Sequence, residues 1–362
     1  MQCNRCVMDT SAEGITFDKD GNCNFCIGLM DRFKNEKENP VANLESFVER
    51  IKRDGKGKKY DCIVGLSGGA DSSYSIYLAK KSGLRVLAVH MDNGWNSELA
   101  TNNIETLVRN MDVDLYTHVI DWQEYKQLMQ SFFDADVIDI ELLYDNAMLA
   151  VNYKLASKYG IKYILSGSNS STEGMRMPTN WNWFKYDKKN IKSIASRNGV
   201  KIKTFPIIST LNYLYYRLVK KISWIPFLDY VDYNKAEAMQ FLQENYGFKP
   251  YPYKHYESVF TRFYQGYMLP EKFGVDKRKL HLSTLICSNQ ISRDDALADL
   301  KNIPYHSQKE LEEDKEYFLK KMNWSESNLQ EYIKKEGKSH ALYGTERPLW
   351  EFYSKIYNKY IK

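Results

Sequence analysis

A buried strand that runs directly into a glycine-rich turn and then a helix constrains this chain more than any other feature. Residues 60–66 form an apolar, partly β-branched run, and a helical pattern follows the turn. The turn reads Ser67-Gly68-Gly69-Ala70-Asp71-Ser72-Ser73. Glycines let backbone N–H groups close around phosphate oxygens, and a helix N-terminus adds a partial positive charge. The segment therefore predicts an anion site at the end of a buried strand.

The same turn lacks the lysine of the G-x-x-x-x-G-K-[ST] loop, which binds nucleotides for γ-phosphate transfer. It resembles instead the PP-loop of ATP pyrophosphatases, which cleave ATP to AMP and pyrophosphate by adenylating a substrate. The resemblance implies that Ser67 and Asp71 act in catalysis. Asp71 is the expected Mg²⁺ ligand, since a carboxylate beside phosphates is a hard oxygen donor; helix capping is its alternative role. The expected ATP contacts in the turn are Ser67, Gly68, Gly69, Asp71, Ser72 and Ser73.

Strand and helix patterns alternate along the middle of the chain. Strand patterns lie at 60–66, 85–90, 114–120 and 161–166, and helical patterns lie at 72–82, 97–111, 122–133 and 146–159. Continuous apolar strands that alternate with helices are typical of a parallel sheet covered on both faces. The sequence thus predicts an α/β fold with a parallel, doubly wound sheet. The resemblance identifies this sheet as a PP-loop sheet of the adenine nucleotide alpha hydrolase type.

Polar segments follow two more of the predicted strands. One segment, 90–94, reads His-Met-Asp-Asn-Gly, and adenine and ribose bind at this point in PP-loop enzymes. The other, 166–173, resembles the Gly-Thr-x-Asn-x-x-Glu loop of ammonia-dependent NAD synthetases, with one extra residue before the glutamate. Since the carboxyl ends of parallel strands meet at one edge, both segments are expected to complete the ATP site. The expected contacts there are His90, Asp92, Asn93, Gly167, Asn169 and Glu173.

Four of the six cysteines lie within the first 26 residues, as two C-x-x-C pairs. The pairs are Cys3 with Cys6 and Cys23 with Cys26, and sixteen residues separate them. This spacing is typical of a tetrahedral zinc site, in which each C-x-x-C turn directs two thiolates at one metal. Four cysteine ligands leave no open position, so we expect a structural Zn²⁺ ribbon. Disulfides are the alternative, and they fit poorly without a secretion signal.

Several downstream segments resemble the N-acetyl sugar amidotransferase family, and the likeness extends from the N-terminus to residue 305. The matching segments are 1–11, 182–191, 253–258, 261–265, 272–278, 281–283, 285–286 and 291–297. This family converts the N-acetyl group of a nucleotide-activated sugar into an acetamidino group during assembly of bacterial surface polysaccharides such as O-antigen and capsule. The resemblance implies that Lys254 and Arg262 act in catalysis on the acceptor side. Further acceptor-side candidates are Arg176, Trp181, Trp183 and Tyr264.

The implied reaction has two steps and needs ammonia. The amide oxygen of the sugar attacks the α-phosphorus of ATP, pyrophosphate leaves, and ammonia then displaces AMP. An N-terminal-nucleophile glutaminase requires a cysteine directly after Met1, but residue 2 is glutamine and Cys3 is a predicted zinc ligand. We therefore expect ammonia from a separate glutaminase subunit with a cyclase-like partner, as in imidazole glycerol phosphate synthase. Free ammonia is the fallback source.

Charge and hydropathy exclude other classes and suggest how the chain is divided. The net charge of +5 is too small to demand a nucleic-acid partner. The most apolar stretch, 211–228, carries three basic residues and a proline, so we expect a buried or interface helix and no membrane span. Without a visible signal peptide, we expect a cytoplasmic protein. The predicted parts are a zinc ribbon (1–30), a connector (31–59), a PP-loop ATP-binding domain (60–208) and a mostly helical region (209–362) that contributes to the acceptor site.

Two other functions fit parts of the sequence. PP-loop enzymes that thiolate tRNA also adenylate, and some carry cysteine-pair ribbons, but they usually need catalytic cysteines, and Cys62 and Cys287 form no obvious pair. They would also favour stronger basic patches with interleaved aromatic residues. The chain could instead be a docking scaffold with a silent nucleotide site, although the intact turn at 67–72 argues against that. Conversion of ATP to AMP separates the enzyme hypotheses from the scaffold.

Overall fold

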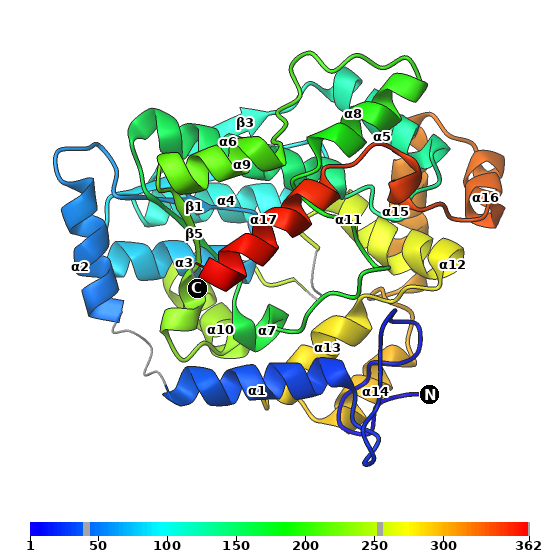
Figure 1. Ribbon diagram of the computed structural model, residues 1–362, viewed down its shortest axis with the longest axis horizontal. Coiled ribbons are helices and arrows are strands. Elements are labelled where there is room, and N and C mark those ends of the chain that lie inside the picture. Colours follow the sequence, from blue (N-terminus) through cyan, green and yellow to red (C-terminus); the bar gives the residue numbers. More distant parts are fainter. Residues whose placement is uncertain (39–43, 252–255, 361–362) are drawn as a thin grey trace.

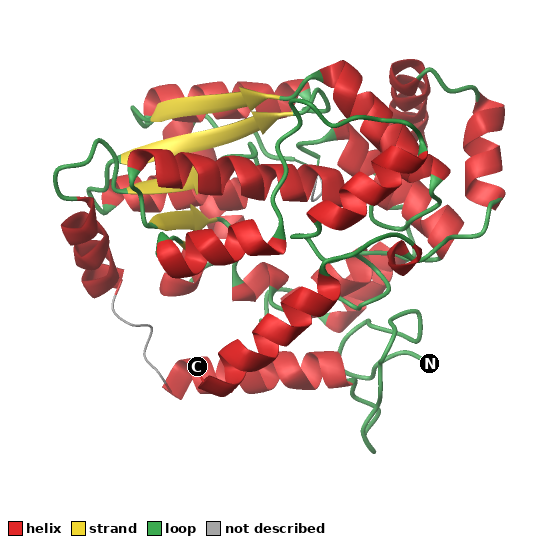
Figure 2. Ribbon diagram, turned by 45° about the horizontal axis from the view of Figure 1, so that its top comes forward, coloured by secondary structure: helices red, strands yellow, loops and turns green. Residues whose placement is uncertain are grey.

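Five parallel strands form one sheet at the centre of the structure, a computed structural model that describes residues 1–38, 44–251 and 256–360. The strands are β1 (Cys62–Gly65), β2 (Val86–Asp92), β3 (Asp114–Val119), β4 (Tyr163–Ser166) and β5 (Ser223–Pro226). Their order is β3-β2-β1-β4-β5, so the direction of winding reverses between β1 and β4. Figure 2 shows the strands as yellow arrows with helices packed around them. In open parallel sheets, ligands bind outside the carboxyl ends of the strands at this reversal.

Helices cover both faces of the sheet and build the rest of the molecule (Figure 1). In the first half they are α1 (Asn24–Glu38), α2 (Leu44–Gly55), α3 (Ala70–Lys81), α4 (Glu98–Asn110), α5 (Trp122–Asp134), α6 (Leu142–Tyr159), α7 (Ser170–Glu173) and α8 (Lys188–Arg197). In the second half they are α9 (Thr210–Leu214), α10 (Lys235–Tyr246), α11 (Val259–Phe263), α12 (Leu269–Phe273), α13 (Arg278–Cys287), α14 (Arg293–Leu300), α15 (Gln308–Met322), α16 (Glu326–Lys334) and α17 (Arg347–Tyr360). Short π-helical turns, η1 (Tyr215–Val219) and η3 (Tyr264–Met268), and 3₁₀ turns, η2 (Phe227–Tyr230) and η4 (His340–Leu342), complete the elements.

Side chains of the central strand alternate between two hydrophobic cores. Cys62 and Val64 of β1 pack in the core shared by α2, α3, α4 and α10, whereas Ile63 packs in the core shared by α5, α6 and α8. Successive side chains of a strand point to opposite faces, so a strand that is apolar throughout needs cover on both sides. The predicted doubly wound parallel sheet is therefore confirmed, and each of the four predicted strands and helices lies within a few residues of its expected place.

The apolar stretch 211–228 does not form the single helix that its composition predicts. Its first part forms α9 and η1, and its last part is the edge strand β5. The helix ends where Lys221 adopts a left-handed backbone with φ of 55°, and the β-favouring Trp224 and Ile225 follow. Leu211 and Val219 are 63% and 65% exposed, so the helical part is a surface element and not a buried one. None of the helices in the described part of the chain is both long and apolar enough to cross a bilayer.

The sheet also extends past the predicted boundary at residue 208, because β5 pairs with β4. The predicted connector at 31–59 contains the end of α1 and the whole of α2, whose Phe47, Val48 and Ile51 pack against the sheet domain. Figure 1 shows α1 and the cysteine-rich N-terminal segment beside α13 and α14, at the side of the molecule away from the sheet. The predicted ribbon at 1–30 thus includes the first turns of α1.

His340 is a neutral histidine enclosed in the core near α8, and it should make the fold sensitive to acid. Its Nδ1 donates to Asn190 Oδ1 over 2.8 Å, and its Nε2 accepts from the Asp139 backbone N–H over 3.2 Å. Burial lowers the pKa of His340 to about 4, whereas a histidine in the unfolded chain titrates near 6.5. The unfolded state therefore binds the extra proton first as the pH falls.

The stability that neutral His340 contributes is present above pH 6.5 and is lost as the pH falls toward 4. The expected loss at pH 4 is about 3 kcal/mol in the free energy of unfolding. Urea titrations between pH 7 and pH 4 measure it, and His340→Gln is the comparison because glutamine does not titrate. If the free energy of unfolding fell equally with pH in the wild-type protein and in His340→Gln, this account would be contradicted.

Candidate active site

The glycine-rich turn leaves the N-terminus of α3 open toward a cavity at the strand ends. Gly68 adopts a φ of 86°, and a Cβ atom there would lie 2.9 Å from the carbonyl oxygen of Ala100. Gly69 is the N-cap of α3, and no side chain caps the helix there. The Ser72 hydroxyl accepts from the Ser67 backbone N–H over 3.3 Å and lies 3.2 Å from the Ser67 hydroxyl. Uncapped N–H groups in a serine-lined turn are suited to phosphate.

Asp71 lies in the first turn of α3 and faces the same cavity. Its Oδ1 accepts from the Tyr233 hydroxyl over 2.5 Å, and its Oδ2 pairs with Lys235 Nζ over 3.3 Å. Burial, together with the Asp71 charge, raises the pKa of Tyr233, which therefore stays a hydrogen-bond donor. Asp71 is not a helix cap, because its carboxylate bonds to side chains that come from the loop before α10 and from its start. A carboxylate and an ammonium side by side here can bind a metal–phosphate pair.

The loop after β4 closes the other side of the phosphate turn. A Cβ atom on Gly167 would lie 2.7 Å from the Ser72 backbone nitrogen, so only glycine allows this approach. Asn169 caps α7 by accepting from the Thr172 N–H over 2.8 Å, and it is 4% exposed. Glu173, at the end of α7, lines the cavity. Gly167 and Glu173 thus line the cavity, as predicted, whereas Asn169 does not line it and stabilises the loop by capping α7.

Of the predicted residues at the end of β2, His90 supports the phosphate turn, and neither His90 nor Asp92 lines a cavity. His90 Nδ1 donates to the Leu66 carbonyl over 2.9 Å, and its Nε2 lies 3.0 Å from Asn96 Nδ2. Burial lowers the pKa of His90, so the ring is a neutral support for the turn. Asp92 accepts from the Gly94 N–H, and Asn93 is the predicted residue of this segment that lines the neighbouring cavity.

One predicted ATP contact within the turn is wrong. Ser73 is fully buried, and its hydroxyl donates to the Gly69 carbonyl over 2.7 Å. In a helix, a serine hydroxyl readily bonds to the carbonyl four residues earlier, which turns this side chain away from the ligand. Ser73 therefore stabilises the first turn of α3, while Ser67 and Ser72 line the cavity.

Two cavities meet at the phosphate turn. The nucleotide cavity, of about 410 Å³, contains the turn, Asp71 and the end of β4. The larger acceptor cavity, of about 760 Å³, extends between α6, α11, α13 and α14. The residues that line both cavities are Ser67, Tyr144, Glu173, Glu257 and His281. A molecule in the acceptor cavity can therefore reach a nucleotide bound at the turn.

The acceptor cavity contains paired charges near its α6 wall. Lys185 bridges Asp139 and Asp145, with Nζ–Oδ2 distances of 2.7 and 2.8 Å. Lys277 pairs with Glu141 over 2.8 Å. Burial raises the pKa of the Asp145 carboxyl. These groups give the cavity both hydrogen-bond donors and acceptors, which can orient a polar ligand.

Arg262, which the sequence placed in catalysis, is instead held in a buried ion pair. It forms two hydrogen bonds to Asp314, of 2.5 and 2.6 Å, and its guanidinium stacks on Tyr256. The Tyr305 hydroxyl donates to the same carboxylate over 3.1 Å. Arg262 lies in the wall of the acceptor cavity, but its positive charge is neutralised by Asp314 of α15.

Replacing Arg262 with methionine should therefore destabilise the fold. Removing one partner of a buried pair costs about 3–5 kcal/mol, because the other charge stays buried. Urea unfolding measures the loss. The control is Arg109→Met, which removes an exposed pair to Glu105 and should cost less than about 1 kcal/mol. An Arg262→Met protein that keeps its stability and loses turnover would restore the catalytic role.

Other acceptor-side candidates occupy structural positions. Trp181 and Tyr264 are fully buried, and their polar atoms bond to the carbonyls of Ser11 and Ile138. Trp183, 8% exposed, donates to Asp187. Arg176 stacks on Phe25, 5.3 Å from the ring centroid. Lys254 lies outside the residues that the structure describes.

Sequence reasoning missed several residues of the site. Glu257 and His281 line both cavities, and both lie in segments that matched the sugar amidotransferase family, so a signal for them was present. His281 Nδ1 contacts the Thr172 carbonyl over 3.1 Å, which links α13 to α7. Tyr233 and Lys235 follow Asp71 by 162 and 164 positions, and no motif connects them.

The four N-terminal cysteines form one compact cluster with the geometry of a zinc site. Their sulfurs all lie within 4.8 Å of one another, with 3.7 Å between Cys3 and Cys26 and 3.6 Å between Cys6 and Cys23. A tetrahedral zinc with bonds of about 2.3 Å places its sulfurs about 3.8 Å apart. All four are buried and free, and the sulfurs lie at the spacing of a shared metal and not at that of a disulfide bond. The donor set therefore fits a structural zinc ion.

Comparison with protein families matches two parts of the chain. Residues 61–223 match the family of the queuosine biosynthesis protein QueC. Residues 257–357 match the C-terminal domain of LPS biosynthesis protein WbpG-like proteins. The first matched segment contains strands β1 to β4 with the phosphate turn, and the second contains α11 to α16 and most of α17.

Curated relatives and solved structures share part of the chain. The uncharacterized protein MJ1599 of Methanocaldococcus jannaschii is 25% identical over 169 residues, 46% of this chain and 58% of its own. A probable tRNA sulfurtransferase of Methanobrevibacter smithii is 26% identical over 182 residues, 47% of this chain and 43% of its own. The chain thus spans about half the length of these relatives.

Two of the similar solved structures are synthetases. NMN synthetase from Francisella tularensis is 15% identical and covers 64% of this chain and 97% of its own, with a TM-score of 0.28. The NH3-dependent NAD synthetase from Campylobacter jejuni is 16% identical and covers 63% and 99%, with a TM-score of 0.28.

Proposed function

This chain is a WbpG-like PP-loop ATP pyrophosphatase, and we propose that it uses ATP to turn the N-acetyl group of a nucleotide-linked sugar into an acetamidino group. The observation that carries the proposal is the junction of two cavities at the phosphate turn. One cavity holds the turn, and the other is walled by α13 and α14, which belong to the WbpG-like segment. An acceptor and ATP can therefore meet there.

The proposed chemistry proceeds through an adenylated amide. The amide oxygen of the acetamido group attacks the α-phosphorus, the bond to the β-phosphate oxygen breaks, and the amide nitrogen loses its proton. This gives an O-adenylyl imidate and pyrophosphate. Ammonia then adds to the imidate carbon, and AMP leaves with the former amide oxygen. Adenylation is needed because an amide carbon is a poor electrophile and its oxygen a poor leaving group.

The residues of this chain supply binding and charge stabilisation for these steps. The open N–H groups of α3, with Ser67 and Ser72, bind the phosphates where negative charge develops. Lys235, beside Asp71, adds a cation at the leaving pyrophosphate. Asp71 would hold Mg²⁺, which neutralises charge on the leaving group when bound. Cys3, Cys6, Cys23 and Cys26 would hold a structural zinc ion.

The same proposal includes a source of ammonia and a cellular role for the enzyme. We place the glutaminase activity on a separate subunit with a cyclase-like partner, and we propose a cytoplasmic role in surface-polysaccharide assembly. Free ammonia would support the same chemistry in the absence of the partner. The substrate would be a nucleotide-linked N-acetyl sugar, because the acceptor cavity offers paired polar groups around a volume of about 760 Å³.

One incubation tests the proposal. The protein is mixed with ATP, Mg²⁺, an ammonium salt and a panel of nucleotide-linked N-acetyl sugars. We expect AMP and pyrophosphate in equal amounts, and a sugar whose mass reflects replacement of one oxygen by NH. The reaction should need both ammonium and the acetamido group. AMP formation that depends on tRNA and on no sugar would overturn the proposal.

Thiolation of tRNA is the second candidate, and similarity to a probable tRNA sulfurtransferase favours it. Sulfur transfer by paired thiols needs two cysteines near the nucleotide. Cys62 is fully buried in β1, and burial raises its pKa. Cys287 packs in a different core, beside the ribbon cysteines. Neither lines either cavity within the described residues, so the sugar reaction is the better-supported proposal.

A further inference from the structure

Helix α13 contacts the acceptor cavity with one face and the cysteine ribbon, residues 1–26, with another. One face lines the acceptor cavity through Arg278, His281 and Thr284, and Lys277 lies just before the helix. The other face is attached to the cysteine ribbon. Val7 N–H donates to Ser283 Oγ over 3.1 Å, and both residues are fully buried. Lys279 Nζ pairs with the Asp9 carboxylate over 2.5 Å.

Helix α14 is attached to the same ribbon by one arginine. Arg293 Nε donates to the carbonyl of Cys6 over 3.2 Å, and its second guanidinium nitrogen donates to the carbonyl of Cys3 over 3.0 Å. Both carbonyls belong to residues of the cysteine cluster. The same helix carries Asp295 and Asp299 along the wall of the acceptor cavity.

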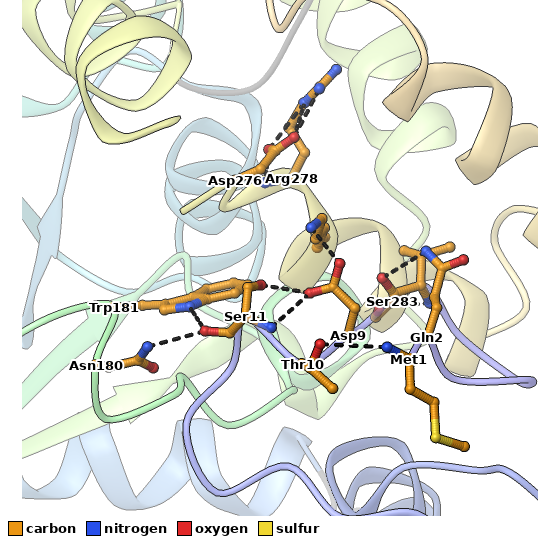
Figure 3. Close-up of polar contacts among 12 residues, drawn as sticks. Met1, Gln2, Asp9, Thr10, Ser11, Asn180, Trp181, Asp276, Arg278 and Ser283 are labelled. Atoms are coloured by element: carbon orange, nitrogen blue, oxygen red, sulfur yellow. Dashed lines mark hydrogen bonds and ion pairs between the residues drawn. The ribbon is translucent and has the colours of Figure 1, made fainter. Parts of the chain in front are cut away.

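The segment 175–182 forms a third wall of the acceptor cavity, and it is also hydrogen-bonded to the ribbon. Figure 3 shows Asn180 and Trp181 directed at Ser11, whose carbonyl accepts from both side chains over 3.0 and 3.2 Å. The Ser11 hydroxyl in turn donates to Asp9 over 2.5 Å. Met175, Met177 and Asn182 of the adjoining segments line the cavity.

These attachments are one-sided. Within the described part of the chain, residues 1–23 form hydrogen bonds and ion pairs beyond the N-terminal segment 1–26 with residues 179–181, with α13 and with Arg293. None reaches the phosphate turn at 67–72. The ribbon thus contacts the acceptor side of the junction directly and the nucleotide side only through shared walls.

We propose that the ribbon is a positioning element for the acceptor cavity: it holds α13, α14 and the 175–182 segment in register with one another. The acceptor role of that cavity rests on the proposed function, whereas the mechanical role does not. Metal binding orders a cysteine cluster that is otherwise unfavourable to fold, so the ribbon offers a rigid base. Loosening it is expected to weaken acceptor binding and leave ATP binding unchanged.

Arg293→Met and Lys279→Met are the test variants, because neither side chain lines a cavity. The matched control is Lys309→Met, which removes a surface pair on α15 whose lysine is 86% exposed. Hydrogen exchange followed by mass spectrometry compares peptides from α13 with peptides from β1 and α3. We expect exchange in α13 to rise roughly tenfold or more in the test variants, as loss of a hydrogen bond to a charged group implies. Exchange at β1 and α3 should stay unchanged.

Steady-state kinetics and metal content supply the second readout. The KM for the sugar acceptor should rise severalfold, the KM for ATP should not change, and bound zinc should stay at the wild-type level. Arg293→Lys keeps one donor and should give an intermediate effect. Removing the metal from the wild-type protein with a chelator should reproduce the exchange pattern of Arg293→Met.

Two outcomes separate this inference from the proposed function. Unchanged exchange in α13, or an equal rise at β1 and α3, would overturn the positioning role whatever the enzyme does. A rise confined to α13 in a protein that modifies no N-acetyl sugar would support the positioning role and reject the sugar reaction. Binding of a non-hydrolysable ATP analogue confirms in each case that the nucleotide side is intact.

Discussion

Replacing Asp71 with asparagine should leave the fold intact and reduce pyrophosphate release roughly a hundredfold or more. Asparagine has the same shape and still accepts a hydrogen bond from Tyr233, which lies 2.5 Å from Oδ1. The substitution removes the charge that faces the nucleotide cavity and pairs with Lys235. Release of pyrophosphate from ATP, measured with saturating acceptor and ammonium, tests the prediction.

The control is Asp54→Asn, because Asp54 has the same kind of partners away from both cavities. It accepts from the Tyr163 hydroxyl over 2.7 Å and pairs with Lys162 over 3.7 Å. Thermal unfolding should shift little in either variant, and the control should keep its turnover. Wild-type turnover in Asp71→Asn would remove Asp71 from the mechanism and leave it as a structural partner of Tyr233.

Gly167→Ala should reduce turnover about a hundredfold, because it pushes two loops of the site apart. The new Cβ atom would lie 2.7 Å from the Ser72 nitrogen and 2.8 Å from the carbonyl carbon of Asp71. Both are backbone atoms and cannot rotate away, so the first turn of α3 has to move. A displacement of about 1 Å at a site that orients a reacting group costs on the order of a hundredfold in rate.

Gly28→Ala is the control for this prediction. Gly28 lies in α1, and a Cβ atom there meets nothing within 4 Å. Alanine should raise the stability of that helix slightly and leave the rate unchanged. The ATP affinity of Gly167→Ala, measured by calorimetry, should fall together with the rate. A normal affinity with a normal rate would show that the β4 loop is free to adjust.

Local patterns predicted the sheet because each strand and helix had its own signal. The run at 62–66 has no polar side chain, and β1 is buried on both faces. The edge strand β5 was missed, although the more exposed edge strand β3 was predicted. The helical pattern at 211–219 runs directly into β5 and dominates the interpretation of the whole stretch.

Long-range contacts limited the prediction of the site. Ser73 was wrongly assigned because a motif gives the residue type and not the direction of the side chain within the helix. Arg262 was assigned to catalysis because nothing in the sequence reveals that Asp314 neutralises it from α15. The paired cysteines lie together as predicted, since two short C-x-x-C turns define their own geometry.

The attachment of Val7 to Ser283 joins residues 276 positions apart. At synthesis rates of about 5–20 residues per second, the ribbon leaves the ribosome roughly 14–55 s before its docking helix. During that time the surface of the ribbon that packs on α13 has no partner, so a zinc-loaded ribbon is present in the cell before its docking is complete. Zinc supply during translation would then influence how much of the chain reaches its final form.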